Sequence, residues 1–414
     1  MLHLLLGTDW TANRDEVMKR IAADVAGRRG NRILMVPELI SHETERRLCA
    51  AAGDTASRYA EVLSFTRLAR RVADSMGSAA EECLDNGGRV VAMAAAAKNL
   101  VSRLKAYAAV ETKPEFLTGL IDAVDEFKRC CISSADLSRA AGETEGSLAQ
   151  KLEELSLLME SYDALCSRGK RDPRDQMTWL LEQMEQGDFA REHVFYIDGF
   201  PDFTRQHLAI LEHLIQASPN VTVSLNCDRE SSHLLAFEKA GDTASQLFLC
   251  ARRAGVDVQI EIIPEKHLPL SPVRERLFQG VISSGAAKEC LDVFRAESPY
   301  LECMGAAERI RGLLAAGCRC RDITVVCTDM TLYQPLVNLV FHRLHIPVYQ
   351  SGTEDILQKS VIATVLMALD AALSGFDQKS VLRYLRSALS PVDPDTCDRI
   401  ENYAIIWGIR GQKW

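Results

Sequence analysis

The chain has 414 residues, of which 47% are hydrophobic and 25% charged, and its formal net charge is -9. This length is more than one hydrophobic core usually serves, so two or three domains are expected. The acidic balance excludes a strongly basic nucleic-acid-binding protein, so any DNA binding would depend on local basic patches.

The beginning of the chain and its cysteines help to predict the cellular compartment of the protein. Residues 1–6 are apolar but have neither a basic n-region nor a cleavage site, so they predict a buried strand rather than a signal peptide. No run of about 18 apolar residues predicts a transmembrane helix. The 13 cysteines lack zinc-ligand spacing. They predict free thiols in a reducing cytoplasm and no metal site.

Short apolar runs and amphipathic stretches alternate at the start of the chain. Strands are predicted at residues 2–6, 32–37 and 61–65, with helices at 13–26 and 42–52 between them. Such βαβ units indicate a parallel sheet covered by helices.

Helical periodicity then dominates from residue 81 to residue 187. Helices are predicted at 91–109, 116–131, 147–167 and 173–186. With no strand-like run among them, these helices indicate an all-helical insertion inside an α/β domain.

Strand signals return at residues 194–197 and 221–225, on either side of a helix at 204–217. A loop with Pro264, Pro269 and Pro272 leads to a second alternation. Its predicted elements are a helix at 305–316, a strand at 323–327, a helix at 333–344, a strand at 346–349 and a helical tail from 356.

These patterns predict four segments. They are a first α/β domain (1–80 and 188–290), a helical insertion (81–187), the start of a second α/β domain (291–355) and a helical segment (356–414). The last segment ends on Trp414 soon after the second alternation begins, and we expect it to be truncated from a larger protein.

The turn after the first predicted strand reads Gly-Thr-Asp-Trp-Thr-Ala-Asn, residues 7–13. A P-loop ATPase has G-x-x-x-x-G-K-[ST] here, whose backbone amides and lysine hold phosphates and whose hydroxyl holds magnesium. Gly7 is in place, but no Gly-Lys-Ser/Thr follows, and Trp10 would crowd the phosphates. Gly7, Thr8 and Thr11 are therefore candidates for a degenerate nucleotide site. The alternative is an ordinary βα turn capped by Thr11 or Asn13.

Asp198 and Gly199 follow the strand predicted at 194–197. A hydrolysing helicase has Asp-Glu here, the aspartate for magnesium and the glutamate for the attacking water. Asp198 completes the degenerate nucleotide site, although a lone aspartate at a strand end is also typical of a cap or turn. Without the lysine and the glutamate, no catalytic residue is expected and the core should not hydrolyse ATP.

A possible DNA contact begins where the third predicted strand ends. Hydroxyls and a helix N-terminus can hold a phosphate, and arginines add positive potential. The candidate residues are Ser64, Thr66, Arg67, Arg70 and Arg71. The alternative is a solvated basic helix face.

Residues 62–71, Val-Leu-Ser-Phe-Thr-Arg-Leu-Ala-Arg-Arg, resemble the T-F-H-S-L-A-x-R segment with which superfamily 1 helicases contact single-stranded DNA. An ordered set of segments across nearly the whole chain resembles the AddB (RexB) family, the B subunits of bacterial AddAB helicase–nucleases. The segments are Val-Pro-Glu (36–38), Asp-Glu-Phe-Lys (125–128), Ile-Asp-Gly-Phe-Pro-Asp-Phe-Thr (197–204), Arg-Asp-Ile-Thr-Val-Val (321–326), Glu-Asn-Tyr (401–403) and Gly-Ile-Arg-Gly (408–411).

The resemblance implies RecA-like (P-loop NTPase-type) domains, as in UvrD-like helicases. It also implies an AddA-type helicase–nuclease partner, with which such a subunit resects DNA double-strand ends for homologous recombination. In that family the B subunit's core follows the strand without unwinding it. The family further implies ATP with magnesium, and a C-terminal nuclease with a four-cysteine iron–sulfur cluster beyond these residues. Many members keep G-x-x-G-S-G-K-[ST] at the first turn, from which this chain departs.

Three hypotheses remain open: a DNA-binding scaffold without ATPase activity, a residual ATPase that uses Asp198, and a pure subunit-docking module built on the helical insertion.

Overall fold

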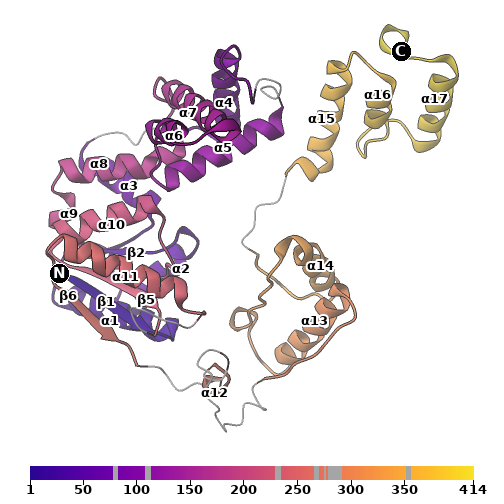
Figure 1. Cartoon of the computed structure of the whole chain (residues 1–414). Helices are drawn as coiled ribbons and strands as arrows, with labels where there is room; N and C mark the ends of the chain where they lie inside the picture. Colours follow the sequence, from indigo (N-terminus) through magenta and orange to yellow (C-terminus); the bar gives the residue numbers. More distant parts are fainter. Residues whose placement is uncertain are drawn as a thin grey trace. The chain divides into compact units, whose positions relative to one another are not determined.

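The computed structural model describes residues 1–77, 83–107, 113–228, 235–264, 270–274, 277, 291–350 and 356–414. It divides into two units, Met1–Asp292 and Val293–Trp414, whose elements are labelled in Figure 1. Pro269 and three of the predicted domain boundaries (80/81, 290/291 and 355/356) lie in or beside segments outside the described residues, and those boundaries stay predictions.

The first unit is built on a six-stranded sheet in which every pair is parallel, in the order β3-β2-β4-β5-β1-β6. The strands are β1 (Leu2–Gly7), β2 (Arg32–Met35), β3 (Ala60–Leu63), β4 (Val194–Ile197), β5 (Val221–Asn226) and β6 (Val258–Ile262). The predicted parallel sheet is confirmed. The edge strand β6, which was not predicted, mixes polar with apolar residues and is largely exposed.

Side chains alternate along the strands and reach a separate core on each face of the sheet. In β1, Leu4 contributes to one core and Leu5 to the other. The Leu5 face is covered by α1 (Trp10–Ala26) and α2 (Ser41–Ala52). The Leu4 face is covered by α3 (Phe65–Ser75), α8 (Gln176–Gln186), α9 (Phe189–Glu192), α10 (Arg205–Ala217) and α11 (Glu238–Arg253). The sheet therefore lies between two layers of helices, and its edge strand β6 stays largely exposed (Figure 1).

The predicted helical insertion forms between α3 and α8 (Figure 1). Its helices are α4 (Asn86–Leu100), α5 (Pro114–Arg129), α6 (Ser134–Gly142) and α7 (Gly146–Cys166). They bury a core of their own, which includes Met93, Leu120 and Tyr162. The insertion is an all-helical lobe whose core is distinct from the two cores of the sheet. The short helix α6 was not predicted.

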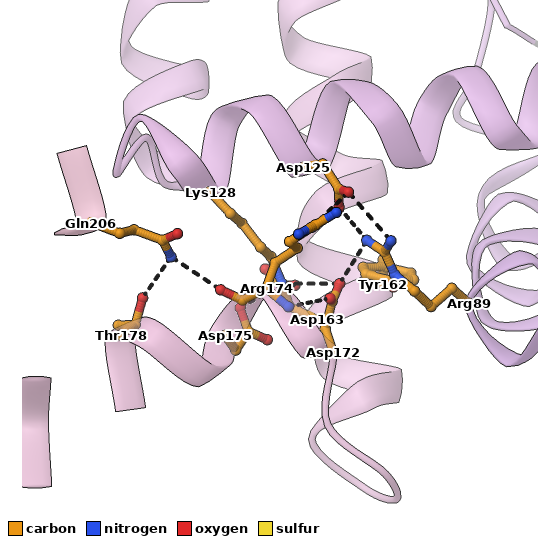
Figure 2. A network of polar contacts seen from close by, with 10 residues as sticks. All are labelled: Arg89, Asp125, Lys128, Tyr162, Asp163, Asp172, Arg174, Asp175, Thr178 and Gln206. Carbon is orange, nitrogen blue, oxygen red and sulfur yellow. Dashed lines mark hydrogen bonds and ion pairs between the residues drawn. The ribbon is translucent and has the colours of Figure 1, made fainter. Parts of the chain in front are cut away.

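A buried polar network joins this lobe to the α/β core (Figure 2). Its ionic members are Arg89, Asp125, Lys128, Asp163, Asp172, Arg174 and Asp175. Asp172 is completely buried and lies just before the 3-10 helix η3 (Pro173–Asp175). From η3 the network reaches α10, because Gln206 donates a hydrogen bond to the carbonyl of Arg174 (3.0 Å). These contacts join α4, α5, α7 and residues 172–175, where the chain leaves the lobe, to α10 in the helix layer on the sheet.

The second unit consists of helices in its described residues. They are α13 (Pro299–Ala315), α14 (Met330–Arg343), α15 (Ser360–Leu373), α16 (Gln378–Leu385) and α17 (Pro394–Trp407). The strands predicted at 323–327 and 346–349 are not formed as paired strands within the described ranges. Both segments instead line a hollow of about 700 Å³ beside α13 and α14. A second RecA-like domain therefore stays a prediction.

In the described ranges, no cysteine forms a disulfide. No described helix combines the length and the apolar character needed to cross a membrane. α12 (Ser271–Arg274) completes the described helices of the first unit.

Candidate functional site

The candidate site lies at the carboxyl edge of the sheet. All six strands are parallel, so the turns that follow β1, β4 and β5 emerge at one edge, where open α/β sheets bind their ligands. A pocket of about 250 Å³ lies between the start of α1 and the loop after β4. Its lining includes Trp10, Asn13, Arg14, Asp198, Phe200 and Asn226. The structure thus brings the first turn and Asp198 together, although β5 separates their strands.

The first turn begins with Gly7 at the end of β1, as predicted. A Cβ on Gly7 would clash with Oδ1 of Asn13, so a larger residue would force the Asn13 side chain to move. The Asn13 amide nitrogen donates to the carbonyls of Gly7 (2.9 Å) and Leu225 (3.0 Å). Asn13 therefore ties the first turn of α1 to the ends of β1 and β5.

Asp9, rather than Thr11 or Asn13, caps α1. Its Oδ1 accepts hydrogen bonds from the backbone amides of Thr11 (2.9 Å) and Ala12 (3.3 Å). The expected cap was wrong because a carboxylate one residue before the helix reaches both amides and favours the positive helix end. Asp9 is only 6% exposed.

Asp198 follows β4 and pairs with Arg14, a residue that was not among the predicted site residues. The Nε of Arg14 lies 2.9 Å from Oδ2 of Asp198, and their side chains are 10% and 6% exposed. The guanidinium also lies over the Trp10 ring, 4.9 Å from its centroid. Counting eight positions from Gly7 along the P-loop pattern would have indicated Arg14, since it stands at the Ser/Thr position.

Magnesium and a nucleotide do not fit these residues. Asp198, which would hold the metal, is engaged by a buried cation. The amides of Thr11 and Ala12, which would face phosphate, already bind the Asp9 carboxylate. Thr8 does not belong to the lining of the pocket that contains Asp198, so its hydroxyl does not join Asp198 in a metal site.

The five predicted DNA-binding residues do not form one patch. Buried Ser64 caps α3 and donates a hydrogen bond to the Glu38 carboxylate. Arg71 pairs with Glu61 at 3.2 Å and lies near Phe189, toward the amino ends of β2 and β4.

Thr66 and Arg67 lie in the first turn of α3, at the carboxyl edge. Thr66 is exposed, whereas Arg67 pairs with Glu45 at 2.8 Å. Arg70 is exposed one turn further and lines a small hollow with Arg171 and Trp179. Of the predicted cations, Arg70 is the one for which no carboxylate partner is found among the described residues.

An aromatic cluster supports the start of α3 from the loop after β4. The rings of Phe65 and His207 are stacked with centroids 4.1 Å apart, and Phe200 meets Phe65 edge-on at 5.5 Å. Burial lowers the pKa of His207 to about 4. The imidazole is therefore neutral at physiological pH and acts as an apolar packing group.

This shift predicts a pH dependence of stability. The folded-state pKa of His207 lies below its unfolded value of about 6.5, so the unfolded chain binds the proton first as the pH falls. We expect His207 to account for a loss of about 2 kcal/mol between pH 7 and pH 5. Urea unfolding of wild type and His207→Phe at both pH values measures it. Equal losses in the two proteins would show that folding does not lower the pKa of His207.

Comparison with known proteins gives a consistent result. Residues 4–273 match the family model described as ADDB, N-terminal. Proteins named as the B subunit of an ATP-dependent helicase/deoxyribonuclease, from Clostridium acetobutylicum, Desulforamulus reducens and Desulforudis audaxviator, are 26%, 28% and 29% identical to it. Each alignment covers 92% of this chain and 34%, 35% and 34% of the relatives, respectively. The chain therefore spans about a third of the length of these relatives.

Proposed function

The chain belongs to the AddB N-terminal family, and from this we propose that it is the N-terminal part of a helicase–nuclease subunit that processes DNA double-strand ends for recombinational repair. Its partner would be an AddA-type helicase–nuclease subunit. In this proposal the RecA-like core is a DNA-binding scaffold without ATPase activity. The ATP-dependent chemistry would belong to other parts of the complex.

The observation that carries the proposal is that other residues replace the groups needed for ATP hydrolysis. Asn13 stands at the lysine position of the first turn and ties two strand ends together. Gly199 stands where the catalytic glutamate would follow Asp198, and its φ of +82° suits glycine. Neither position retains a group that could activate water or bind a terminal phosphate, and this supports a core without ATPase activity.

Support for DNA contact comes from the start of α3. Thr66 offers an exposed hydroxyl at the helix N-terminus, and Arg70 an exposed guanidinium one turn further. Arg67 is half-exposed and would exchange Glu45 for a phosphate. Hydroxyls and arginines near a helix N-terminus are suited to phosphates and carry no base specificity. We propose Thr66, Arg67 and Arg70 as the contact residues.

We expect Arg70→Ala to weaken binding of a single-stranded oligonucleotide several-fold. If Arg70 neutralises one phosphate, the slope of log affinity against log salt should become shallower by about 0.7. Fluorescence anisotropy over a salt series measures both quantities. Binding that keeps its affinity and slope in Arg70→Ala would remove this residue from the site.

Arg191→Ala is the matched control, because Arg191 is an exposed arginine on α9, just before β4 and so at the opposite edge of the sheet. It should leave binding unchanged. A wild-type chain that binds no oligonucleotide at low salt would instead favour a docking role for the helical insertion.

A further inference from the structure

The first turn and Asp198 are arranged as in a phosphate-binding site, but side chains of the same protein occupy the positions of the ligand. Aligned on Gly7, the chain has Ala12, Asn13 and Arg14 where a P-loop has Gly, Lys and Ser/Thr. The helix amides that would bind a phosphate instead bind the negatively charged side chain of Asp9. The aspartate that would bind the metal ion instead binds the positively charged side chain of Arg14.

Asp9 lies where a phosphate would be bound. A helix N-terminus binds anions through its free amides and the positive end of its dipole. In α1 these amides, from Thr11 and Ala12, bind the Asp9 carboxylate. The second carboxylate oxygen of Asp9 and Oδ1 of Asn13 are both buried without a hydrogen-bond partner among the described residues. The turn thus presents acceptors, which would repel rather than bind a phosphate.

Arg14 takes the place of the metal ion. In an active site, the Ser/Thr hydroxyl and the strand-end aspartate would share a magnesium ion. Here the residue at the hydroxyl position carries its own positive charge, and its Nε contacts Oδ2 of Asp198 at 2.9 Å. The guanidinium also lies over the Trp10 ring. A cation that competes for Asp198 would have to displace a buried ion pair and leave Arg14 without a counter-ion.

We propose that Asp9 and Arg14 are built-in substitutes for the phosphate and the magnesium ion, so that the turn excludes magnesium nucleotide instead of binding it weakly. The two substitutes hold the ends of β1 and β4 as a ligand would. This inference concerns the turn alone and does not depend on whether α3 binds DNA.

The metal substitution is tested with Mn²⁺ followed by electron paramagnetic resonance. The wild-type chain should leave Mn²⁺ free, and Arg14→Thr should bind one ion at least tenfold more tightly. The added binding should disappear in Arg14→Thr/Asp198→Asn. Mn²⁺ bound by the wild type and lost in Asp198→Asn alone would overturn the proposal, and this arm does not require any Arg14 variant to fold.

The phosphate substitution is tested by calorimetric titration with Mg·ADP. The wild type should show no binding at millimolar nucleotide. A variant with Asp9→Ser, Ala12→Gly, Asn13→Lys and Arg14→Thr should bind Mg·ADP, with an affinity that falls at least tenfold when magnesium is omitted.

The same variant with Asp9 retained is the matched control, and its affinity should be at least tenfold weaker. Equal affinities with and without Asp9 would refute its role as a phosphate substitute. Micromolar Mg·ADP binding by the wild type would refute the exclusion itself. Circular dichroism identifies a variant that fails to fold, and the wild-type titration decides in that case.

Discussion

Replacing Lys128 by methionine is expected to lower the free energy of unfolding by about 3–5 kcal/mol, the usual cost of removing one partner from a buried ion pair. The Lys128 ammonium is 6% exposed and lies 2.7 Å from both Asp163 and Asp175. It lies 3.5 Å from Asp172, which is completely buried (Figure 2). Methionine keeps most of the apolar length of the side chain and removes the charged ammonium group. Urea unfolding followed by circular dichroism measures the loss.

The pH dependence separates lost charge from lost packing in Lys128→Met. Burial already raises the pKa of Asp175, although Lys128 opposes the rise. Without Lys128 the pKa should rise further, and a carboxyl whose folded pKa lies above its unfolded value loses stability as the pH rises through the folded pKa. The destabilisation should therefore be smaller at pH 5 than at pH 7. A loss equal at both pH values would point to packing.

Lys98→Met is the matched control, because Lys98 is exposed on α4 in the same lobe. Its effect should stay within about 0.5 kcal/mol. A Lys128→Met protein as stable as this control would show that the buried network contributes no net stability.

Replacing Arg14 by methionine should also cost about 3–5 kcal/mol, because Asp198 would stay buried without a counter-ion. The double variant Arg14→Met/Asp198→Asn should be more stable than the sum of the two single losses predicts, by about 0.5–3 kcal/mol. Chemical unfolding of all four proteins gives this coupling energy. Simple additivity would contradict a specific ion pair.

Lys19→Met on the same helix is the control for Arg14→Met. Lys19 is mostly exposed and pairs with Glu16 at 3.2 Å on the surface. Surface pairs of this kind contribute about 0–1 kcal/mol. The contrast between positions 14 and 19 therefore measures the effect of burial on one helix.

The central strands could be predicted because parallel strands covered on both faces are nearly continuous apolar runs. β6 has no continuous apolar run, because polar residues alternate with Val258, Ile260 and Ile262. This alternation suits an edge strand, on which Ile260 and Ile262 are exposed. α6 did carry a local signal, the capping box from Ser133 to Asp136, which predicts a helix start even where the apolar pattern is short.

At 323–327 and 346–349 the error was the opposite, because strands were predicted that these described residues do not form. Their apolar β-branched residues have strand propensity, but a strand also needs a neighbour for its backbone groups. Val326 and Tyr349 are 86% and 90% exposed. Local composition could not reveal that no pairing would form in the described part of this unit.

The candidate site was predictable in position but not in chemistry. Gly7 and Asp198 were identifiable because each ends an apolar strand, and the carboxyl edge then brings them together. The pairing of Arg14 with Asp198 joins residues 184 positions apart, so no local pattern reports it. The choice of Asp9 over its polar neighbours as the cap likewise depends on which side chain reaches the free amides of α1.

Because β5 lies between β1 and β4, a side chain near the end of β1 must cross a wide gap to contact the end of β4. Neighbouring strands are about 4.8 Å apart, so the ends of β1 and β4 are separated by about 10 Å. A serine or threonine after β1 spans this gap only with an ion and its hydration shell as a bridge. Arginine is long enough to span it alone, from the first turns of α1. The contact with Asp198 therefore needs a long side chain at position 14 as well as a positive charge, and a shorter residue there would leave Asp198 without this partner.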